Sequence, residues 1–197
     1  MTPSIRLAVS DDAGAIASIY RPYVENSRIS FEETAPGAEE MAARMQSVLH
    51  PWLIMEVDGA IGGYVASSPY HRRPAYRWTV ETGIYLSRDV QGHGLGRTLL
   101  SAMLELLTRQ GFVTAIGAIA LPNDASIALH EKLGFTRSGT YQEVGYKLGE
   151  WTSVGLWQKD LAPRTAMPAE PLPFAQLTGL NMRAGAAHDI AGRGLQQ

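Results

Sequence analysis

The chain has 197 residues, no cysteine and a formal net charge of −2. This length fits one domain with a tail, and the absence of cysteine excludes a disulfide framework, a thiolate metal site and a cysteine nucleophile. The small net charge, without a dense run of Lys or Arg, gives no support to a nucleic-acid or membrane partner. No apolar run approaches the roughly 18 residues of a membrane span and no secretory signal is visible, so we expect a cytoplasmic protein.

The first half of the chain alternates between extended and helical patterns. The predicted elements are a strand at 5–9, a helix that begins at Ser10 and Asp11, a loop at 26–37, a helix that ends at Pro51, and strands at 52–57 and 60–66. The helix before Pro51 places Met41, Met45 and 48–49 on one side. Asp58-Gly59 between two apolar runs is typical of a hairpin turn.

The second half repeats this alternation. Its predicted elements are a loop at 67–77, a strand at 78–86, a glycine-rich turn at 91–96, a helix to Gln110, a buried strand at 112–120, a short helix at 123–133 and two strands that bracket Trp151. The order β-α-α-β-β-β-α-β-α-β-β indicates an α/β protein with a mixed sheet.

The composition changes after Leu161, where prolines precede a Gly/Ala-rich end. Such a segment is typical of a tail without its own core. The alternative is a tail that docks through Leu172, Phe174 and Leu177, on this chain or on a partner subunit. We therefore expect a domain at 1–161 and a tail at 162–197.

Three glycines lie within five residues of the turn Gln91-Gly92-His93-Gly94-Leu95-Gly96. Glycine lets successive backbone N–H groups face one ligand, and a helix N-terminus adds positive potential, so this turn suits a pyrophosphate. A dinucleotide fingerprint would need glycine in place of Arg97, and a P-loop would need Gly-Lys-Ser/Thr. A plain turn without a ligand stays open from the turn alone.

A second motif follows one helix and one strand later, in the run Asn123-Asp124-Ala125-Ser126-Ile127-Ala128-Leu129-His130-Glu131-Lys132-Leu133-Gly134-Phe135. Together the two motifs resemble Q/R-x-x-G-x-G/A and N-x-x-A/S-x-x-L-Y-x-x-x-G-F of the GNAT acetyltransferase superfamily, over roughly residues 4–161. The resemblance implies the GNAT fold, a mixed and mostly antiparallel sheet splayed at its central strands and flanked by helices. It also implies acetyl-CoA as cosubstrate.

The resemblance places the coenzyme on three segments. The strand before the glycine turn would pair with the pantetheine arm, the turn would hold the pyrophosphate, and the second motif would contact the coenzyme near the pantetheine. The implied coenzyme-binding residues are Ile84, Tyr85, Leu86, Gln91, Gly92, His93, Gly94, Leu95, Gly96, Arg97, Asn123 and Ser126. Asn123 also suits a helix N-cap, and both roles can coexist.

Amide formation from a thioester needs a base for the amine, a donor for the oxyanion and a proton for the thiolate. Glu81, three residues before Ile84, is the candidate base if burial raises its pKa; the alternative is a solvent-facing glutamate. His130 stands where many GNAT enzymes carry tyrosine and can give or accept a proton; the alternative is a hydrogen-bonded core histidine. By analogy the Leu86 N–H is the oxyanion donor. No metal is expected, because the five histidines show no ligand spacing.

The chain further resembles the phosphinothricin N-acetyltransferase family in the segments Trp52-Leu53, Glu56-Val57-Asp58-Gly59, Ala75-Tyr76-Arg77-Trp78-Thr79-Val80-Glu81, Leu121-Pro122-Asn123-Asp124 and His130-Glu131. That family, with relatives acting on methionine sulfoximine and sulfone, acetylates a free α-amino group. The resemblance assigns Glu81 and His130 as the catalytic pair. One departure concerns Ser153, which stands where the family has an aspartate two residues after Trp151.

A substrate of this kind has two anionic ends, so its pocket needs donors. Arg73 and Tyr76 precede the catalytic strand, and Phe31 matches a family aromatic that lines the pocket; the alternative is a solvated surface loop. Acetylation of a protein N-terminus and a non-catalytic CoA-binding module remain alternative functions. The family and the late residues Trp151 and Trp157 predict a homodimer, because large apolar groups there risk an exposed patch.

Overall fold

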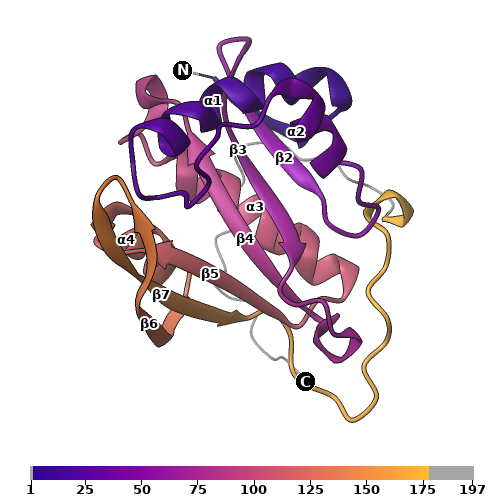
Figure 1. Ribbon diagram of the computed structural model, residues 1–197. Coiled ribbons are helices and arrows are strands. Elements are labelled where there is room, and N and C mark those ends of the chain that lie inside the picture. Colours follow the sequence, from indigo (N-terminus) through magenta and orange to yellow (C-terminus); the bar gives the residue numbers. More distant parts are fainter. Residues whose placement is uncertain (1, 178–197) are drawn as a thin grey trace, which may run out of the picture.

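A seven-stranded sheet runs through the computed structural model, which describes residues 2–177 (Figure 1). The strands are β1 (Pro3–Leu7), β2 (Trp52–Val57), β3 (Ala60–Pro69), β4 (Thr79–Leu86), β5 (Thr114–Ala120), β6 (Thr136–Lys147) and β7 (Glu150–Asp160). They lie in the order β1-β2-β3-β4-β5-β7-β6, and neighbours are antiparallel except β4 and β5. The mixed, mostly antiparallel sheet expected from the sequence is confirmed.

Helices cover both faces of this sheet. The helices are α1 (Ala13–Glu25), α2 (Ala38–Arg44), α3 (Leu95–Gln110) and α4 (Asp124–Lys132). Because side chains alternate along a strand, Leu53 and Met55 join the core beneath α3, whereas Ile54 joins the core beneath α1 and α2. The sheet therefore separates an α1/α2 face from an α3/α4 face, each with its own apolar core.

The central strands β4 and β5 part after three residue pairs. Their parallel pairing covers Thr79–Glu81 on β4 and Thr114–Ile116 on β5. Beyond it, β4 stays paired with β3 as far as Leu86, and β5 stays paired with β7 as far as Ala120. This gives the splay expected at the central strands, and Glu81 is the last residue before the fork.

The helix predicted to reach Pro51 ends earlier, at Arg44. The hydroxyl of Ser47 accepts hydrogen bonds from the N–H groups of Leu49 (3.3 Å) and His50 (3.0 Å), and such local bonds compete with a helix. Val48, placed on the buried side in the prediction, is 66% exposed. Residues 45–51 therefore form an irregular segment.

Two predictions about the late strands also need correction. Trp151 lies inside β7 rather than between the two strands, since the turn falls on Leu148 and Gly149. Trp157 is only 2% exposed and belongs to the α3-side core, so it has no surface to offer a partner. Earlier in the chain, β3 continues to Pro69, into residues predicted as a loop.

A buried lysine fastens the loop between α1 and α2 to the far strand β6. Lys147 is 8% exposed, and its Nζ donates to the carbonyl oxygens of Val24 (2.5 Å) and Ser30 (2.6 Å). The ring of Phe31 lies directly over Gly145, where a Cβ atom would come within 2.2 Å of it. The loop is thus held across the open side of the fork.

The tail follows β7 and returns along the molecule to the irregular segment after α2 (Figure 1). Leu172 N–H donates to the carbonyl of Gln110 at 2.8 Å, and Phe174 and Leu177 pack against the α3-side core. Residues 178–197, the rest of the predicted tail, lie outside the described residues. Within residues 2–177, no helix combines the length and apolar character that crossing a membrane requires.

We expect Lys147→Met to lower the free energy of unfolding by about 1–3 kcal/mol, because it leaves two buried carbonyls without a donor. Urea denaturation measures the change. Lys132→Met, which replaces an exposed lysine at the end of α4, is the matched control and should change stability little. Equal stability of the two variants would contradict the role given to the Lys147 ammonium.

Candidate active site

A cavity of about 610 Å³ opens where β4 and β5 part, and we call it the glycine-loop cavity. It is bounded by the unpaired edge of β4, the glycine turn, the end of β5 and the first turns of α4. Of the residues predicted to bind coenzyme, the following line it: Ile84, Tyr85, Leu86, Gln91, Gly92, Gly94, Gly96, Arg97, Asn123 and Ser126. The fold therefore brings together segments that are far apart in the sequence.

The glycine turn has the backbone geometry that its sequence predicts. Gly92 (φ +82°) and Gly94 (φ +75°) lie in the left-handed region, where L side chains are strained. A Cβ atom on either would meet no other atom within 4 Å, so the backbone of both faces open space. Gly94 is also the N-cap of α3, so the N-terminus of a 16-residue helix points into the turn.

A tyrosine that the sequence did not single out occupies the edge of β4. The Tyr23 hydroxyl donates to the Leu86 carbonyl at 2.6 Å and accepts from the Leu86 N–H at 3.3 Å. Gln91 Nε2 donates to both the Tyr23 hydroxyl (3.0 Å) and the Leu86 carbonyl (3.1 Å). The Leu86 N–H, expected to serve as oxyanion donor, is thus engaged with Tyr23.

His130 reaches the same cavity from α4. It is 3% exposed, and its Nδ1 lies 2.8 Å from the carbonyl oxygen of Ser126, which can only accept. Nδ1 must therefore carry the hydrogen. Burial lowers the pKa of the His130 imidazole, although the Ser126 bond acts in the opposite direction. The neutral ring then has its lone pair on Nε2, a buried atom without a hydrogen-bond partner among residues 2–177.

A glycine on β5 makes room for this imidazole. A Cβ atom on Gly117 would lie 2.7 Å from both Cδ2 and Nε2 of His130. Gly117 directly follows Ile116, the residue paired with Glu81 at the end of the parallel ladder. His130 therefore sits over the first residue of β5 beyond the fork.

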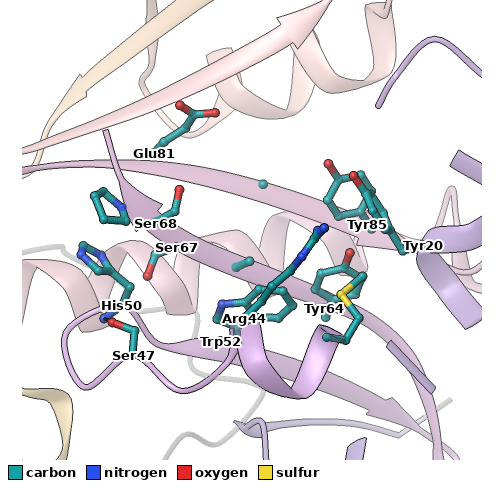
Figure 2. A pocket seen from close by; sticks show the side chains of 14 residues that line it. Tyr20, Arg44, Ser47, His50, Trp52, Tyr64, Ser67, Ser68, Glu81 and Tyr85 are labelled. Atoms are coloured by element: carbon teal, nitrogen blue, oxygen red, sulfur yellow. Dashed lines mark hydrogen bonds between the residues drawn. The ribbon is translucent and has the colours of Figure 1, made fainter. Parts of the chain in front are cut away.

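The second cavity, about 510 Å³, lies on the α1/α2 face, and we call it the aromatic cavity (Figure 2). Its lining residues come from α1, α2, the irregular 45–51 segment and strands β2 to β4: Tyr20, Met41, Arg44, Ser47, His50, Trp52, Tyr64, Ala66, Ser67, Ser68, Pro69, Glu81, Gly83 and Tyr85. Gly83 and Tyr85 line both cavities. The two hollows thus meet across β4, just beyond Glu81.

Glu81 and His130 lie on opposite faces of the fork. Tyr85 lies four residues after Glu81 on β4, so the two side chains share the α1/α2 face. Glu81 also lines the aromatic cavity. Gly117 and the His130 ring above it share the α3/α4 face with Ala115. Burial raises the pKa of the Glu81 carboxyl, as a base that acts near neutral pH requires.

The cation of the aromatic cavity is already paired. Arg44 donates to Glu32 through two nitrogens (2.8 and 2.9 Å) and to Glu40 at 2.5 Å, and Glu32 accepts from the Tyr20 hydroxyl at 2.9 Å. Arg44 lowers the pKa of Glu32, so both groups stay charged. Figure 2 shows the Arg44 side chain directed toward Tyr20 and Tyr85. The cavity therefore offers hydroxyls and aromatic faces rather than a free positive charge from Arg44.

Several predicted site residues lie outside both cavities. His93 is exposed, and the Leu95 side chain is buried in the α3-side core, so Leu95 has only its backbone to offer. Phe31 covers Gly145, and Arg73 is exposed. Tyr76, 41% exposed, makes ring contacts with His71 and Tyr70 (centroids 5.0 and 5.7 Å apart).

Sequence reasoning missed Tyr23 and the residues of the aromatic cavity other than Glu81 and Tyr85. The rings of Tyr20, Tyr64 and Tyr85 contact one another, with centroids 4.7–6.5 Å apart, although they come from three different elements. Tyr20 and Tyr23 lie on α1, where apolar residues at helical spacing indicate a core-facing side rather than a binding site. Within residues 2–177, no three His, Asp or Glu side chains gather in a way that would hold a metal ion.

Known proteins with similar sequences identify the family of this chain. Residues 15–135 match the Acetyltransferase (GNAT) family. Phosphinothricin N-acetyltransferase of Streptomyces viridochromogenes is 38% identical over 88% of this chain and 94% of its own. L-methionine sulfoximine/L-methionine sulfone acetyltransferase of Pseudomonas aeruginosa is 33% identical over 85% and 100%.

A solved acetyltransferase structure is also similar to this chain. The phosphinothricin acetyltransferase from Sinorhizobium meliloti, in complex with AcCoA, superposes with a TM-score of 0.82 at 37% identity, over 87% of this chain and 96% of that one. The similarity extends along most of the chain, and it agrees with the splayed sheet and with the glycine turn at a helix N-terminus. The chain belongs to the GNAT family of acetyltransferases.

Proposed function

We propose that this enzyme transfers the acetyl group of acetyl-CoA to the α-amino group of a small amino-acid-like compound such as phosphinothricin, methionine sulfoximine or methionine sulfone. The amine would attack the thioester directly while both substrates are bound, in a cytoplasmic homodimer. The observation that carries the proposal is the meeting of two cavities at the fork, with Glu81 on one side and His130 on the other.

The glycine-loop cavity fits the coenzyme. The backbone of residues 92–97 would hold the pyrophosphate at the N-terminus of α3, and Arg97 would add a positive charge there. The edge of β4 that β5 leaves free at Ile84–Leu86 would pair with the pantetheine arm, and at Leu86 the coenzyme would replace Tyr23. Asn123 caps α4 by accepting from the Ser126 N–H at 3.2 Å, and both residues line the cavity, so a contact with the coenzyme is compatible with the cap.

Glu81 would remove the proton from the substrate ammonium, directly or through water. An α-ammonium has a pKa of about 8 in model peptides, so a carboxylate whose pKa is raised is a better matched base than an ordinary one. The raised pKa of Glu81 follows from burial alone, which is the condition set for this role. Glu81 also lies beside the last point at which β4 and β5 touch.

His130 would act on the coenzyme side of the fork. Its neutral form carries a lone pair on Nε2, so it can accept a hydrogen bond or a proton in the glycine-loop cavity. Once the neutral amine has attacked, the nitrogen of the tetrahedral intermediate is cationic, and it would give a proton to His130 Nε2, which would pass a proton to the thiolate sulfur as the C–S bond breaks. The pair would then work in sequence, with Glu81 acting before attack and His130 after it.

Phe31, Arg73 and Tyr76 would bind the substrate from outside the aromatic cavity. Tyr76 contacts Tyr70, whose pKa is raised by burial first and then by Tyr141, Tyr76 and the Glu81 charge, which supports a position of Tyr70 near the Glu81 carboxylate. An acceptor that enters between the 70–77 loop and the fork would meet Glu81 before it meets the coenzyme.

Two other functions make different predictions in one experiment. An acetyltransferase for protein N-termini would acetylate a peptide and leave free amino acids untouched, and a non-catalytic CoA-binding module would acetylate neither. The test is release of free thiol from acetyl-CoA with phosphinothricin, methionine sulfoximine, methionine sulfone, ordinary amino acids and a short peptide. Turnover of the peptide alone, or of nothing, would overturn the proposal.

Coenzyme binding should depend on the glycine turn. We expect Gly94→Val to weaken acetyl-CoA binding at least about tenfold, because a branched side chain would occupy the space over the turn. Gly59→Val is the matched control, since Gly59 has a similar φ (+86°), equally open surroundings and a position in the β2–β3 turn. Calorimetry on the two folded variants measures the difference, and equal affinities would refute the assignment.

Turnover should depend on Glu81 in a pH-dependent manner. Glu81→Gln keeps the shape but removes the base, so we expect kcat to fall by about 10²–10⁴-fold with coenzyme affinity nearly unchanged. In the wild type, kcat should rise with pH along a limb displaced above the ordinary carboxyl range, because burial raises the Glu81 pKa. The variant should lose that limb. His130→Ala should slow turnover less than Glu81→Gln does. If Glu81→Gln keeps the kcat of the wild type, Glu81 is not the base, and the positioning of the substrates alone explains the rate.

The proposed homodimer has a candidate surface on the β6–β7 hairpin. Five large apolar side chains there are 54–62% exposed: Tyr141, Val144, Tyr146, Leu148 and Trp151. We expect light scattering to report a dimer and Tyr146→Lys to shift it toward monomer. Met167→Lys, at a side chain 91% exposed outside the hairpin, is the matched control. A monomeric wild type at working concentration would contradict this part of the proposal.

A further inference from the structure

A buried glutamine connects three parts of the molecule that the catalytic proposal leaves unexplained. Gln110 is the last residue of α3 and only 1% exposed. Its side-chain Nε2 donates to two carbonyl oxygens, those of Leu49 (2.9 Å) and Leu172 (2.8 Å), and its backbone carbonyl accepts from the Leu172 N–H (2.8 Å), whereas its Oε1 has no partner among residues 2–177. A polar side chain at a helix end normally faces solvent, so burial with both amide hydrogens used indicates a specific task.

One partner of Gln110 is the tail, whose residues 169–177 we call the strap. The strap starts at the head of β4, where the Trp78 Nε1 donates to the Ala169 carbonyl and Arg77 pairs with Glu170, both at 2.8 Å. It then passes Gln110 and ends against the irregular 45–51 segment, where the Phe174 N–H donates to the Val48 carbonyl (3.3 Å). The strap therefore links the strand that carries Glu81 to that segment.

The other partner is a wall of the aromatic cavity. Ser47 and His50, in the 45–51 segment, both line that cavity, and His50 Nδ1 is buried without a partner among residues 2–177. The segment has no helix or strand to fix it. Its backbone carbonyls at Val48 and Leu49 are held by the strap and by Gln110, and the Pro51 carbonyl by the N–H and hydroxyl of Ser67.

We propose that Gln110 and the strap position the Ser47–His50 wall of the acceptor side of the active site, and so determine how tightly the acceptor binds. The inference rests on the proposed function, which places the acceptor on the Glu81 side of the sheet. The glycine-loop cavity shares neither this wall nor the strap. Loss of the strap therefore weakens acceptor binding and leaves coenzyme binding as it was.

The test compares three variants with the wild type. Gln110→Met keeps the volume and removes both side-chain donors. A chain ending at Pro168 lacks the strap, and a chain ending at Leu177 keeps every strap contact and serves as the matched control. The measurements are KM and kcat with phosphinothricin and with methionine sulfone, the Kd of acetyl-CoA, and hydrogen exchange of the backbone amides at 45–50.

We expect the acceptor KM to rise about 5–20-fold in Gln110→Met and in the chain ending at Pro168, with kcat and the coenzyme Kd within about twofold of the wild type. Combining the two changes should add little to either alone, because they disturb one network. Exchange at 45–50 should quicken in both variants. The chain ending at Leu177 should match the wild type in every measurement.

Three results would overturn the inference. Unchanged KM in folded variants would show that the wall does not depend on the strap, and a parallel loss of coenzyme affinity would indicate general loosening. A chain ending at Pro168 that no longer folds would make the strap part of the core. Failure of the proposed function is seen separately, as a wild type that acetylates neither probe, whereas hydrogen exchange still reports on the wall.

Discussion

Three residue pairs hold β4 against β5, and the active site depends on where that short parallel ladder stops. If the pairing ran the full length of both strands, the edge of β4 would be occupied by β5 and no coenzyme could pair with it. Because β4 stays bound to β3 and β5 to β7, the strands diverge without leaving either one unsupported. Hydrogen-bonded strands therefore support both sides of the opening, and fixed placement of two substrates lowers the entropic part of a bimolecular barrier.

The two faces of the fork create different environments for its two titratable groups. Burial disfavours charge on both, which raises the pKa of a carboxyl and lowers that of an imidazole. Burial therefore moves the pKa of the Glu81 carboxyl up toward neutrality and moves the pKa of the His130 imidazole down, away from it. The sheet itself keeps the two side chains apart.

Local patterns in the sequence predicted the elements that local forces fix. The Asp58-Gly59 hairpin, the glycine turn and the helix up to Gln110 depend on neighbouring residues, and the structure has them where expected. The 45–51 segment is turned away from the helix by the Ser47 hydroxyl and held by Gln110 and the tail, more than sixty residues away, so helical spacing alone gave a wrong boundary. The aromatic cavity could not be predicted for a similar reason. Its tyrosines are core residues of separate elements that meet only in the folded sheet.

The contact between His130 and Gly117 links the evolution of two positions. The imidazole occupies the volume that any side chain at 117 would need, so the residue on β5 must stay a glycine for as long as a ring packs above it. Replacing the ring by a small residue would free that volume and permit alanine at 117. Directed evolution toward other acceptors should therefore vary the two positions as a pair. In a library that changes position 117 alone, nearly every variant would displace the His130 imidazole.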